Sequence, residues 1–439
     1  MTRAPRRDTE LGLIVLVALI TAGAYALASL GKSASLPANI GPFLAIILAM
    51  LAVAHVAVRR LAPRGDAVLL PVAGLLNGLG YVFIARLDQS LAGLQAVWTG
   101  LGILAFVATL VVVRQARDLE RYRYSFALLG VGLLMMPLLP VVGRNINGAR
   151  LWVRLGPINF QPGEMAKITL GIFFAAYLVE KRELLSDFGK GRLLPQPRAI
   201  GPILLAWGAS ILVMTAEKDL GSSLLFFTLF ISMLWLATDR GAYLGIGAVL
   251  FGVGSFFAYS SFAHVRERVE IWLDPWSRAA SQGYQLVQGL FALGSGGIAG
   301  TGIGLGSPQQ IPAAATDFIF AAIGEELGLL GTAALIVAFL LIVGTGMRIA
   351  IRAEQPFEKL LAAGLTTIVG VQTFIIIGGV TRIVPLTGIT LPFVSYGGSS
   401  LLANYVLLAL LIRISNDTAE RRDRVAQELT AARVDRQHG

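Results

Sequence analysis

Apolar runs long enough to cross a lipid bilayer recur along the chain, and they constrain its fold more than any other feature. A transmembrane helix needs about 20 predominantly apolar residues. About twelve runs meet this need, at 11–31, 41–58, 68–85, 94–113, 124–142, 163–179, 199–216, 221–238, 242–262, 317–350, 360–380 and 399–414. Charged residues make up only 14% of the chain, against roughly 25% in soluble domains. The sequence predicts an all-α polytopic membrane protein with about twelve transmembrane helices.

The basic residues predict how these spans are oriented. If the N-terminus is cytoplasmic, 25 of the 36 Lys and Arg fall in inner segments, as the positive-inside rule requires. The net charge of +10 is then a topology signal and does not indicate nucleic-acid binding. The run Leu11–Leu30 is too long for a cleaved signal peptide, so we expect a retained first span. Both termini are expected in the cytoplasm, with 416–439 as a charged, frayed helix on the inner surface.

Cysteine and histidine counts exclude several kinds of catalysis. The chain has no cysteine, which excludes disulfides and thiol chemistry. Its histidines are His55, His264 and His438, too few and too scattered for a histidine metal site or a Ser-His-Asp triad.

The unusual polar sequence lies in four predicted outer loops, at 143–164, 217–221, 263–316 and 381–398. The longest separates the ninth and tenth spans. Polar, Gly-rich backbone beside a span is tolerated where it lines protein or water. The segment Ser395–Ser400 therefore indicates either a wall of an outer cavity or an ordinary external loop.

Charged residues also occur where several spans begin. Glu164 and Lys167 are three residues apart and share a helix face, so they form either a helix-end pair at the headgroup level or a charged cavity wall. Asp219 starts the eighth span, where helix capping alone could explain it. Thr316 and Asp317 also suit a helix cap.

Two features favour a functional Asp317. A long Gly-rich loop leads into it, and Glu325 and Glu326 follow in apolar surroundings, which is costly without a role. The pattern Gly294-x-Gly296 in this loop is not a dinucleotide fingerprint, because no βαβ unit surrounds it. No Gly-Lys-Ser/Thr follows it, so it is not a P-loop either.

Several motifs in one order resemble the SEDS family (shape, elongation, division and sporulation), the RodA/FtsW glycosyltransferases of bacterial peptidoglycan. The resemblance covers about residues 68–415. The matching stretches are Phe160–Lys167, Asp219–Ser223, Gly283–Gln285 with Gln288, Ala292–Gly297, Thr316–Ala321, Glu325–Gly328 and Leu391–Ser399.

The resemblance implies polymerisation of lipid II into undecaprenyl-linked glycan strands on the outer face of the bacterial cytoplasmic membrane. It places the family's essential acid at Asp317 and carries its charged motif residues to Arg150, Glu164 and Lys167. Further candidates for substrate binding or the cavity wall lie in the matching motifs: Asp219, Tyr284, Gln288, Ser395 and Ser399. It also implies a divalent cation, Mg²⁺ or Mn²⁺, with Asp317 and Glu325 as candidate ligands, and a class B penicillin-binding protein (a transpeptidase) as partner.

Asp317 could serve as the general base for the attacking sugar hydroxyl. A helix N-terminus lowers the pKa of an acid, whereas a base works best with a pKa near the operating pH. Burial or the neighbouring Glu325 and Glu326 would have to raise the pKa of Asp317; alternatively, Asp317 chiefly holds the metal.

We divide the chain into two additional N-terminal helices (1–62), as in actinobacterial-looking members, a membrane core (63–415) and the charged tail (416–439). The short basic tail favours the elongation type, RodA, over the septal type, FtsW. A lipid II flippase or transporter, and a scaffold that only recruits the transpeptidase, are the alternative functions.

Overall fold

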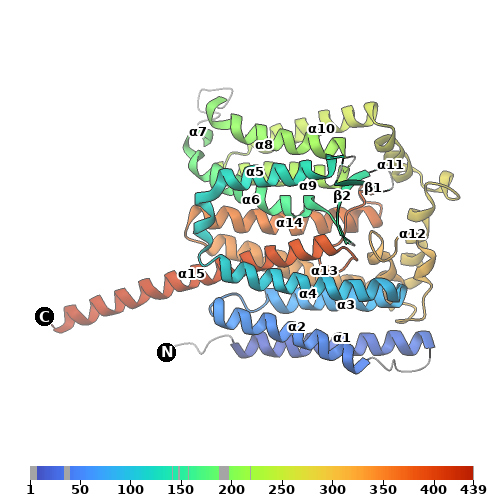
Figure 1. Ribbon diagram of the computed structural model, residues 1–439, viewed down its shortest axis with the longest axis horizontal. Helices are drawn as coiled ribbons and strands as arrows, with labels where there is room; N and C mark the ends of the chain where they lie inside the picture. The colour runs from blue at the N-terminus through green and yellow to red at the C-terminus, as the bar shows by residue number, and fades with distance from the viewer. Residues whose placement is uncertain are drawn as a thin grey trace.

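The computed structural model describes residues 7–33, 40–140, 142–146, 149–156, 158–186, 197–217 and 219–438. It is a bundle of helices that run roughly side by side (Figure 1). The long helices are α1 (Arg7–Ser33), α2 (Ile40–Leu61), α3 (Leu69–Leu87), α4 (Gln89–Val112), α5 (Arg123–Met135), α6 (Pro162–Glu180), α8 (Pro197–Ala216), α9 (Leu220–Thr238), α10 (Ala242–Ser261), α13 (Ile319–Arg352), α14 (Pro356–Val380) and α15 (Gly398–His438). Each of the twelve predicted spans falls on one of them.

Nine helices in the described part of the chain are long and apolar enough to cross a membrane. The other three predicted spans lie on α2, α5 and α8, and α5 is continued by a short 3-10 turn, η2 (Met136–Leu138). The polytopic membrane fold is thereby confirmed.

The centre of the bundle is formed by α6 and α14, whose side chains are buried along most of their length. Around them pack α5, α9, α13 and α15. The helices α1 and α2 lie along one edge of the bundle, and α8 and α10 along the opposite edge (Figure 1). The helix α10 exposes Leu, Val and Phe side chains over most of its surface, as expected of a helix that faces lipid.

Two predicted outer loops contain secondary structure that the sequence did not indicate. The 143–164 loop holds an antiparallel sheet in the order β1 (Gly143–Ile146), β2 (Ala149–Leu155), β3 (Ile158–Phe160). The 263–316 loop holds α11 (Ala263–Leu273), η3 (Trp276–Arg278), α12 (Tyr284–Gly296) and η4 (Pro308–Gln310). Both loops lie at the end of the bundle opposite the one from which α15 extends (Figure 1).

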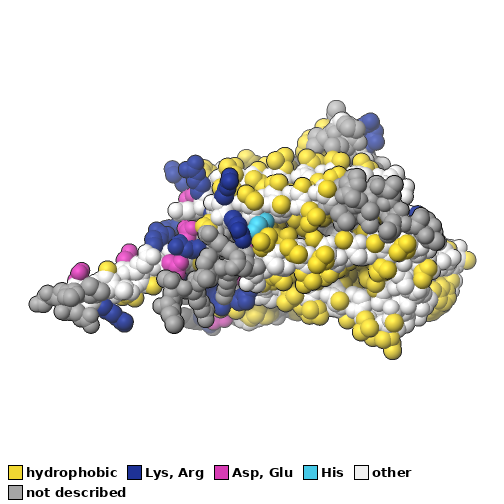
Figure 2. All heavy atoms as spheres, turned by 90° about the horizontal axis from the view of Figure 1, so that it is seen from below, with side chains coloured by type: hydrophobic (Ala, Val, Ile, Leu, Met, Phe, Trp, Pro, Cys, Tyr) yellow, Lys and Arg dark blue, Asp and Glu magenta, His cyan; other side chains and the backbone are white. Residues whose placement is uncertain are grey.

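Charge is distributed unevenly between the two ends. Figure 2 shows Lys and Arg side chains gathered near the end from which α15 extends, with hydrophobic side chains over the middle of the body. The short helix α7 (Arg182–Ser186) and the 3-10 turn η1 (Ala116–Tyr122) lie at this same end of the bundle.

The C-terminal tail differs from the expected frayed helix on the inner surface. It continues α15 without a break and projects from the body (Figure 1). Ion pairs hold its first turns: Arg421 pairs with Glu358, and Arg422 pairs with Glu354 at 3.4 Å.

Candidate functional site

Asp317 lies in a cleft of about 300 Å³ at the loop-bearing end of the bundle. The cleft is bounded by α11, by the start of α12 and by the segment Leu386–Gly388. Arg268 and Glu267 from α11 contribute charged groups to it. The cleft therefore combines a carboxylate that is partly buried with charged and apolar walls, as binding sites for polar ligands do.

The backbone before Asp317 is held by the loop that precedes α15. Ser395 Oγ donates a hydrogen bond to the Thr316 carbonyl at 2.6 Å and accepts one from the Leu391 amide at 2.9 Å. The Tyr396 amide donates to the Ala315 carbonyl at 2.8 Å. The buried Ser395 side chain thus connects two predicted outer loops, 263–316 and 381–398.

Asp317 does not cap the following helix. The N-cap of α13 is Phe318, and no side chain makes a capping hydrogen bond there. The reading of Thr316 and Asp317 as a cap was wrong, because the helix begins two residues after the acid. Asp317 is thus directed to the cleft and does not satisfy the helix end.

Burial raises the pKa of the Asp317 carboxyl to about 6, while the Arg268 guanidinium and the Thr316 hydroxyl act to lower it. Glu325 and Glu326 are not among the causes. Burial, rather than the neighbouring acids, therefore brings this pKa into the range in which a carboxylate works as a base near neutral pH.

The α11 helix is fixed against the 381–398 loop by reciprocal hydrogen bonds. Arg268 donates to the Leu386 carbonyl at 2.8 Å. Arg382 Nε donates to the Trp272 carbonyl at 2.8 Å, and Trp272 Nε1 donates back to the Arg382 carbonyl at 3.1 Å. These contacts place the Arg268 guanidinium beside Asp317.

A second set of charged residues lies where α6 and α9 begin. Lys167 Nζ is 2.8 Å from Glu164 Oε2 and 2.8 Å from Gln372 Oε1. All three side chains are buried, so the predicted ion pair exists but does not lie at an exposed helix end. A buried pair of this kind needs further hydrogen bonds to be tolerated, and Gln372 supplies one.

Asp219 lies immediately before α9. Its carboxylate caps α9, accepting a hydrogen bond from the Ser222 amide at 2.9 Å. It is also buried, and its pKa is raised by that burial, with Glu164 adding to the rise and Lys167 opposing it. Burial likewise raises the pKa of the nearby Glu217 to about 8. The cap is confirmed, and Asp219 also lies within the electrostatic reach of the Glu164–Lys167 pair.

The segment Thr387–Thr390 connects the two sets of residues. Gln372 Nε2 donates to the Thr390 carbonyl at 2.8 Å. Gly388, in the left-handed region at φ +76°, leaves room for both Asp317 and Arg268, whose atoms would lie 3.7 Å from a Cβ at this position. One short loop thus separates the buried lysine from the cleft.

Glu325 and Glu326 hold the Gly-rich loop. Glu325 Oε1 accepts a hydrogen bond from the Ser307 amide at 2.8 Å, and Glu326 Oε2 accepts one from the Gly304 amide at 2.9 Å. Arg86 Nε lies 3.4 Å from Glu326 Oε1. Both acids therefore have structural partners, and neither lines the Asp317 cleft.

The described residues contain no group of three or more His, Cys, Asp or Glu placed to hold a metal ion. Mg²⁺ is usually bound by one or two carboxylates together with waters and substrate phosphates. Asp317 and Glu267 in the cleft fit that incomplete kind of donor set, and Glu325 fits less well because its carboxylate is engaged by the Ser307 amide.

The remaining predicted residues are spread around the same end. Arg150 is exposed on β2. Tyr284 is exposed at the first turn of α12, and Gln288 is partly buried one turn later. Ser399 accepts a hydrogen bond from the Gln161 amide at 2.8 Å, which fixes the start of α6. The structure does not bring Arg150, Tyr284 or Gln288 into the Asp317 cleft.

Sequence reasoning missed Arg268 and Gln372. Arg268 lies in a helix that carries several charged residues, and no spacing distinguishes it from the others. Gln372 did leave a signal, because it is the one amide within the apolar run 360–380 and polar groups inside spans usually have a role.

Comparison with known proteins identifies the family. A family model described as "Cell cycle protein", covering FtsW, RodA and SpoVE, matches residues 75–420. The peptidoglycan glycosyltransferase RodA of Mycobacterium tuberculosis is 46% identical over 425 residues, which is 94% of this chain and 91% of that protein. A probable peptidoglycan glycosyltransferase FtsW of Geobacter metallireducens is 32% identical over 338 residues, 76% of this chain and 85% of that protein.

Solved structures agree with this assignment. A chain of a peptidoglycan synthase complex that coordinates polymerization and crosslinking has a TM-score of 0.68 and 27% identity, covering 81% of this chain and 98% of that one. The rod shape determining protein RodA of Thermus thermophilus has a TM-score of 0.56 and 26% identity, covering 80% of this chain and 97% of that one. The predicted resemblance is confirmed, and the chain belongs to the FtsW/RodA/SpoVE family of peptidoglycan glycosyltransferases.

Proposed function

We propose that this peptidoglycan glycosyltransferase polymerises lipid II into glycan strands, with Asp317 as the catalytic base. The observation that carries this proposal is a carboxylate in a cleft whose burial raises its pKa to about 6. A base with that pKa is largely ionised at neutral pH and still accepts a proton readily.

In the proposed reaction Asp317 takes the proton from the 4-hydroxyl of the acceptor's GlcNAc. The oxygen then forms a bond to the anomeric carbon of the donor sugar, and the bond from that carbon to the pyrophosphate breaks. Undecaprenyl pyrophosphate leaves with the bonding electron pair. Arg268, which lines the same cleft, stabilises the negative charge that develops on the pyrophosphate.

The other charged residues have supporting roles in this proposal. Lys167 and Gln372 fix the Thr390 end of the loop beside the cleft. Arg150, exposed on β2 and outside the cleft, contacts the lipid-linked substrate. If Asp317 chiefly holds the metal instead, it and Glu267 in the same cleft would bind Mg²⁺ or Mn²⁺, which would neutralise pyrophosphate charge.

We place this chemistry on the outer face of the cytoplasmic membrane, with both termini in the cytoplasm. The support is the distribution of Lys and Arg, which gather at the end opposite the cleft (Figure 2). We also propose a role in cell elongation, since identity is 46% to the mycobacterial RodA and 32% to the Geobacter FtsW. A class B penicillin-binding protein is the proposed partner, in line with the synthase complex among the similar structures.

The decisive experiment measures glycan formation from labelled lipid II by purified protein in detergent, where no second compartment exists for transport. Polymer formed there supports an enzyme and opposes a flippase. Asp317→Asn should lower the rate by about 10²- to 10⁴-fold, the usual contribution of a general base. Glu270→Gln is the matched control, because it removes one negative charge from a partly exposed ion pair with Arg278 that lies outside the lining of the cleft. Full polymerisation by Asp317→Asn would end the proposal.

A further inference from the structure

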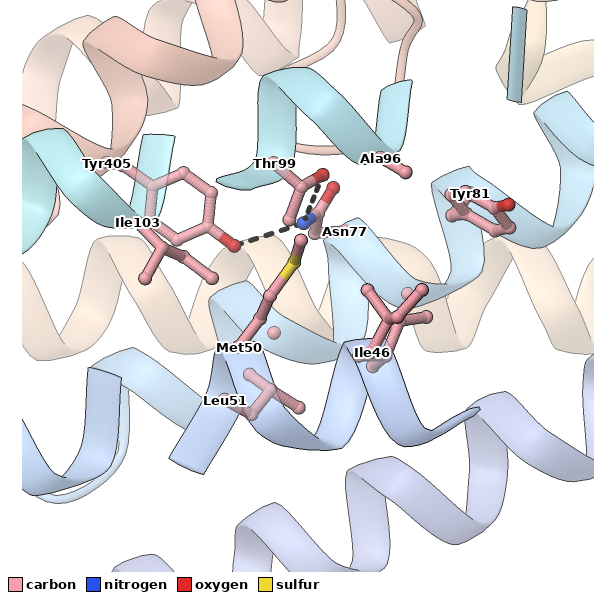
Figure 3. A pocket seen from close by; sticks show the side chains of 12 residues that line it. Ile46, Met50, Leu51, Asn77, Tyr81, Ala96, Thr99, Ile103 and Tyr405 are labelled. Atoms are coloured by element: carbon pink, nitrogen blue, oxygen red, sulfur yellow. Dashed lines mark hydrogen bonds between the residues drawn. The ribbon is translucent and has the colours of Figure 1, made fainter. Parts of the chain in front are cut away.

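A cavity of about 210 Å³ lies inside the bundle between α2 and the helices α3, α4 and α15. Ile46, Met50 and Leu51 of α2 form one wall, and Asn77, Thr99 and Tyr405 lie across from them (Figure 3). It shares no lining residue with the Asp317 cleft. Its volume exceeds the cavity of about 150 Å³ that is large enough to bind benzene.

Among the described residues that line this cavity, one buried side-chain atom lacks a hydrogen-bond partner. The Thr99 hydroxyl donates to the Gln95 carbonyl at 2.8 Å, so its oxygen accepts a hydrogen bond from Asn77 Nδ2 at 3.2 Å. Asn77 Nδ2 also donates to the Tyr405 hydroxyl at 3.0 Å. Because the Thr99 hydroxyl proton is already donated to Gln95, only the amide nitrogen can donate to Thr99, and this contact fixes which way the Asn77 amide points (Figure 3).

Asn77 Oδ1 is thereby left as an acceptor without a hydrogen-bond donor among the described residues. The side chain is only 7% exposed, so bulk water does not compensate it. An unpaired acceptor is costly at membrane depth, which points to a ligand that donates a hydrogen bond.

The walls determine the rest of the ligand. The polar side chains of the lining are Asn77, Thr99, Tyr81 and Tyr405. The other lining residues are apolar, and no Asp, Glu, Lys or Arg occurs among the described residues of the lining. Ile46 lines the cavity and is also 50% exposed on the surface of the bundle. A hydrocarbon chain can therefore leave the cavity beside Ile46 and continue into the bilayer.

We propose that this cavity binds a neutral, long-chain alcohol, whose hydroxyl donates to Asn77 Oδ1 and whose hydrocarbon chain lies against α2. Because α2 supplies one wall, the site does not exist without this helix. The proposal gives the additional N-terminal helices a role, that of completing a lipid-binding site, and it does not depend on the catalytic role of Asp317.

The test is photolabelling of the purified full chain with octanol that carries a diazirine on its chain, followed by mass-spectrometric mapping. Labels should fall on cavity residues of α2, α3, α4 or α15. Excess octanol should remove the labels, whereas octyltrimethylammonium, with the same chain and a charged head, should not. Labels only outside the cavity, or equal protection by both competitors, would overturn the proposal without any variant.

Two variants test the contacts themselves. Asn77→Leu keeps the approximate size of the side chain and removes the acceptor, and it should reduce cavity labelling about five- to tenfold, the effect of one hydrogen bond. Ala96→Leu fills the cavity and should abolish labelling.

Val97→Leu, on the exposed face of the same helix, is the control for both variants and should be labelled to the same extent as the unaltered chain. Unchanged labelling of Asn77→Leu would rule out the hydroxyl contact, and unchanged labelling of Ala96→Leu would rule out the cavity.

Discussion

Lys167 Nζ donates to Gln372 Oε1 at 2.8 Å, and this hydrogen bond between residues 205 positions apart in the chain joins the central helices α6 and α14. The side-chain amide of Gln372 also donates a hydrogen bond to the Thr390 carbonyl. Because the Thr387–Thr390 segment borders Asp317 and Arg268 at Gly388, the buried lysine and the cleft are mechanically connected.

Replacing Gln372 with Leu should lower both stability and activity. The change leaves the Lys167 ammonium with one partner fewer and the Thr390 carbonyl without its donor. A hydrogen bond to a charged group contributes about 1.5–3 kcal/mol, so we expect the free energy of unfolding to fall by about 2 kcal/mol. Glycan synthesis should fall as well, because the loop beside Asp317 loses its anchor. Thr373→Val, beside it on α14, should change neither quantity, since the buried Thr373 hydroxyl has no described partner.

The rate of glycan synthesis should rise with pH through a midpoint near 6. Asp317 must be deprotonated to act as a base, and the pKa of its carboxyl is about 6. The Arg268 guanidinium acts to lower that pKa, so Arg268→Gln should move the midpoint of kcat/KM to higher pH. Arg268→Lys keeps the charge and should leave the midpoint close to that of the unaltered chain. A pH profile that does not move in Arg268→Gln contradicts the assignment of the midpoint to Asp317.

The membrane fold could be predicted because span length and the placement of Lys and Arg are local properties of the sequence. The Asp317 cleft could be predicted only in part. Family motifs indicate Asp317, but Arg268 reaches it because α11 docks on the 381–398 loop through Arg382 and Trp272. That docking depends on contacts more than 100 residues apart in sequence, which no local pattern encodes.

The role of Glu325 shows a second limit of sequence reasoning. An acid in an apolar run can be a metal ligand or a partner for backbone amides, and sequence alone does not separate the two. The structure places its carboxylate on the Ser307 amide. The sheet in the outer loop at 143–164 was not predicted for a related reason, because strand pairing between β1 and β2 depends on register and not on composition.

Glycan synthesis should require a divalent cation, and the requirement should depend on Asp317 more than on Glu325. A chelator should stop synthesis, and Mg²⁺ or Mn²⁺ should restore it. Glu325→Gln retains an oxygen that accepts from the Ser307 amide, so the metal concentration for half-maximal activity should stay unchanged. A large rise in that concentration for Glu325→Gln would instead assign Glu325 to the metal site.

Breaking the Arg86–Glu326 pair should destabilise the fold strongly. The Glu326 side chain is fully buried and that of Arg86 is only 9% exposed, so Arg86→Met leaves a buried charge uncompensated at a cost of about 3–5 kcal/mol. The double variant Arg86→Met with Glu326→Gln should recover part of this loss, because the charge is gone and the amide oxygen still accepts from Gly304. Arg278→Met, which breaks a partly exposed pair with Glu270, should cost only about 1 kcal/mol. Denaturant titration in mixed micelles measures the free energy of unfolding of all three variants. Equal losses in Arg86→Met and in the double variant would argue against a charge effect.

Gly328→Ala should disrupt the contact between α13 and the Gly-rich loop. Gly328 interrupts the helix at φ 65° and ψ −163°, a conformation that essentially only glycine adopts. A Cβ at this position would lie 2.3 Å from the Gly300 amide nitrogen and 2.6 Å from the Ile298 carbonyl oxygen. Both neighbours are backbone, so neither can rotate away, and the Leu330 amide would lose its hydrogen bond to the Ile298 carbonyl. We expect the temperature of thermal unfolding, followed by tryptophan fluorescence, to fall by several degrees. Gly344→Ala, in the same helix with open space at its Cβ position, should leave it unchanged or raise it slightly, because alanine favours the helix over glycine by about 1 kcal/mol. If both variants unfold at the same temperature, the strained conformation of Gly328 contributes nothing to the fold.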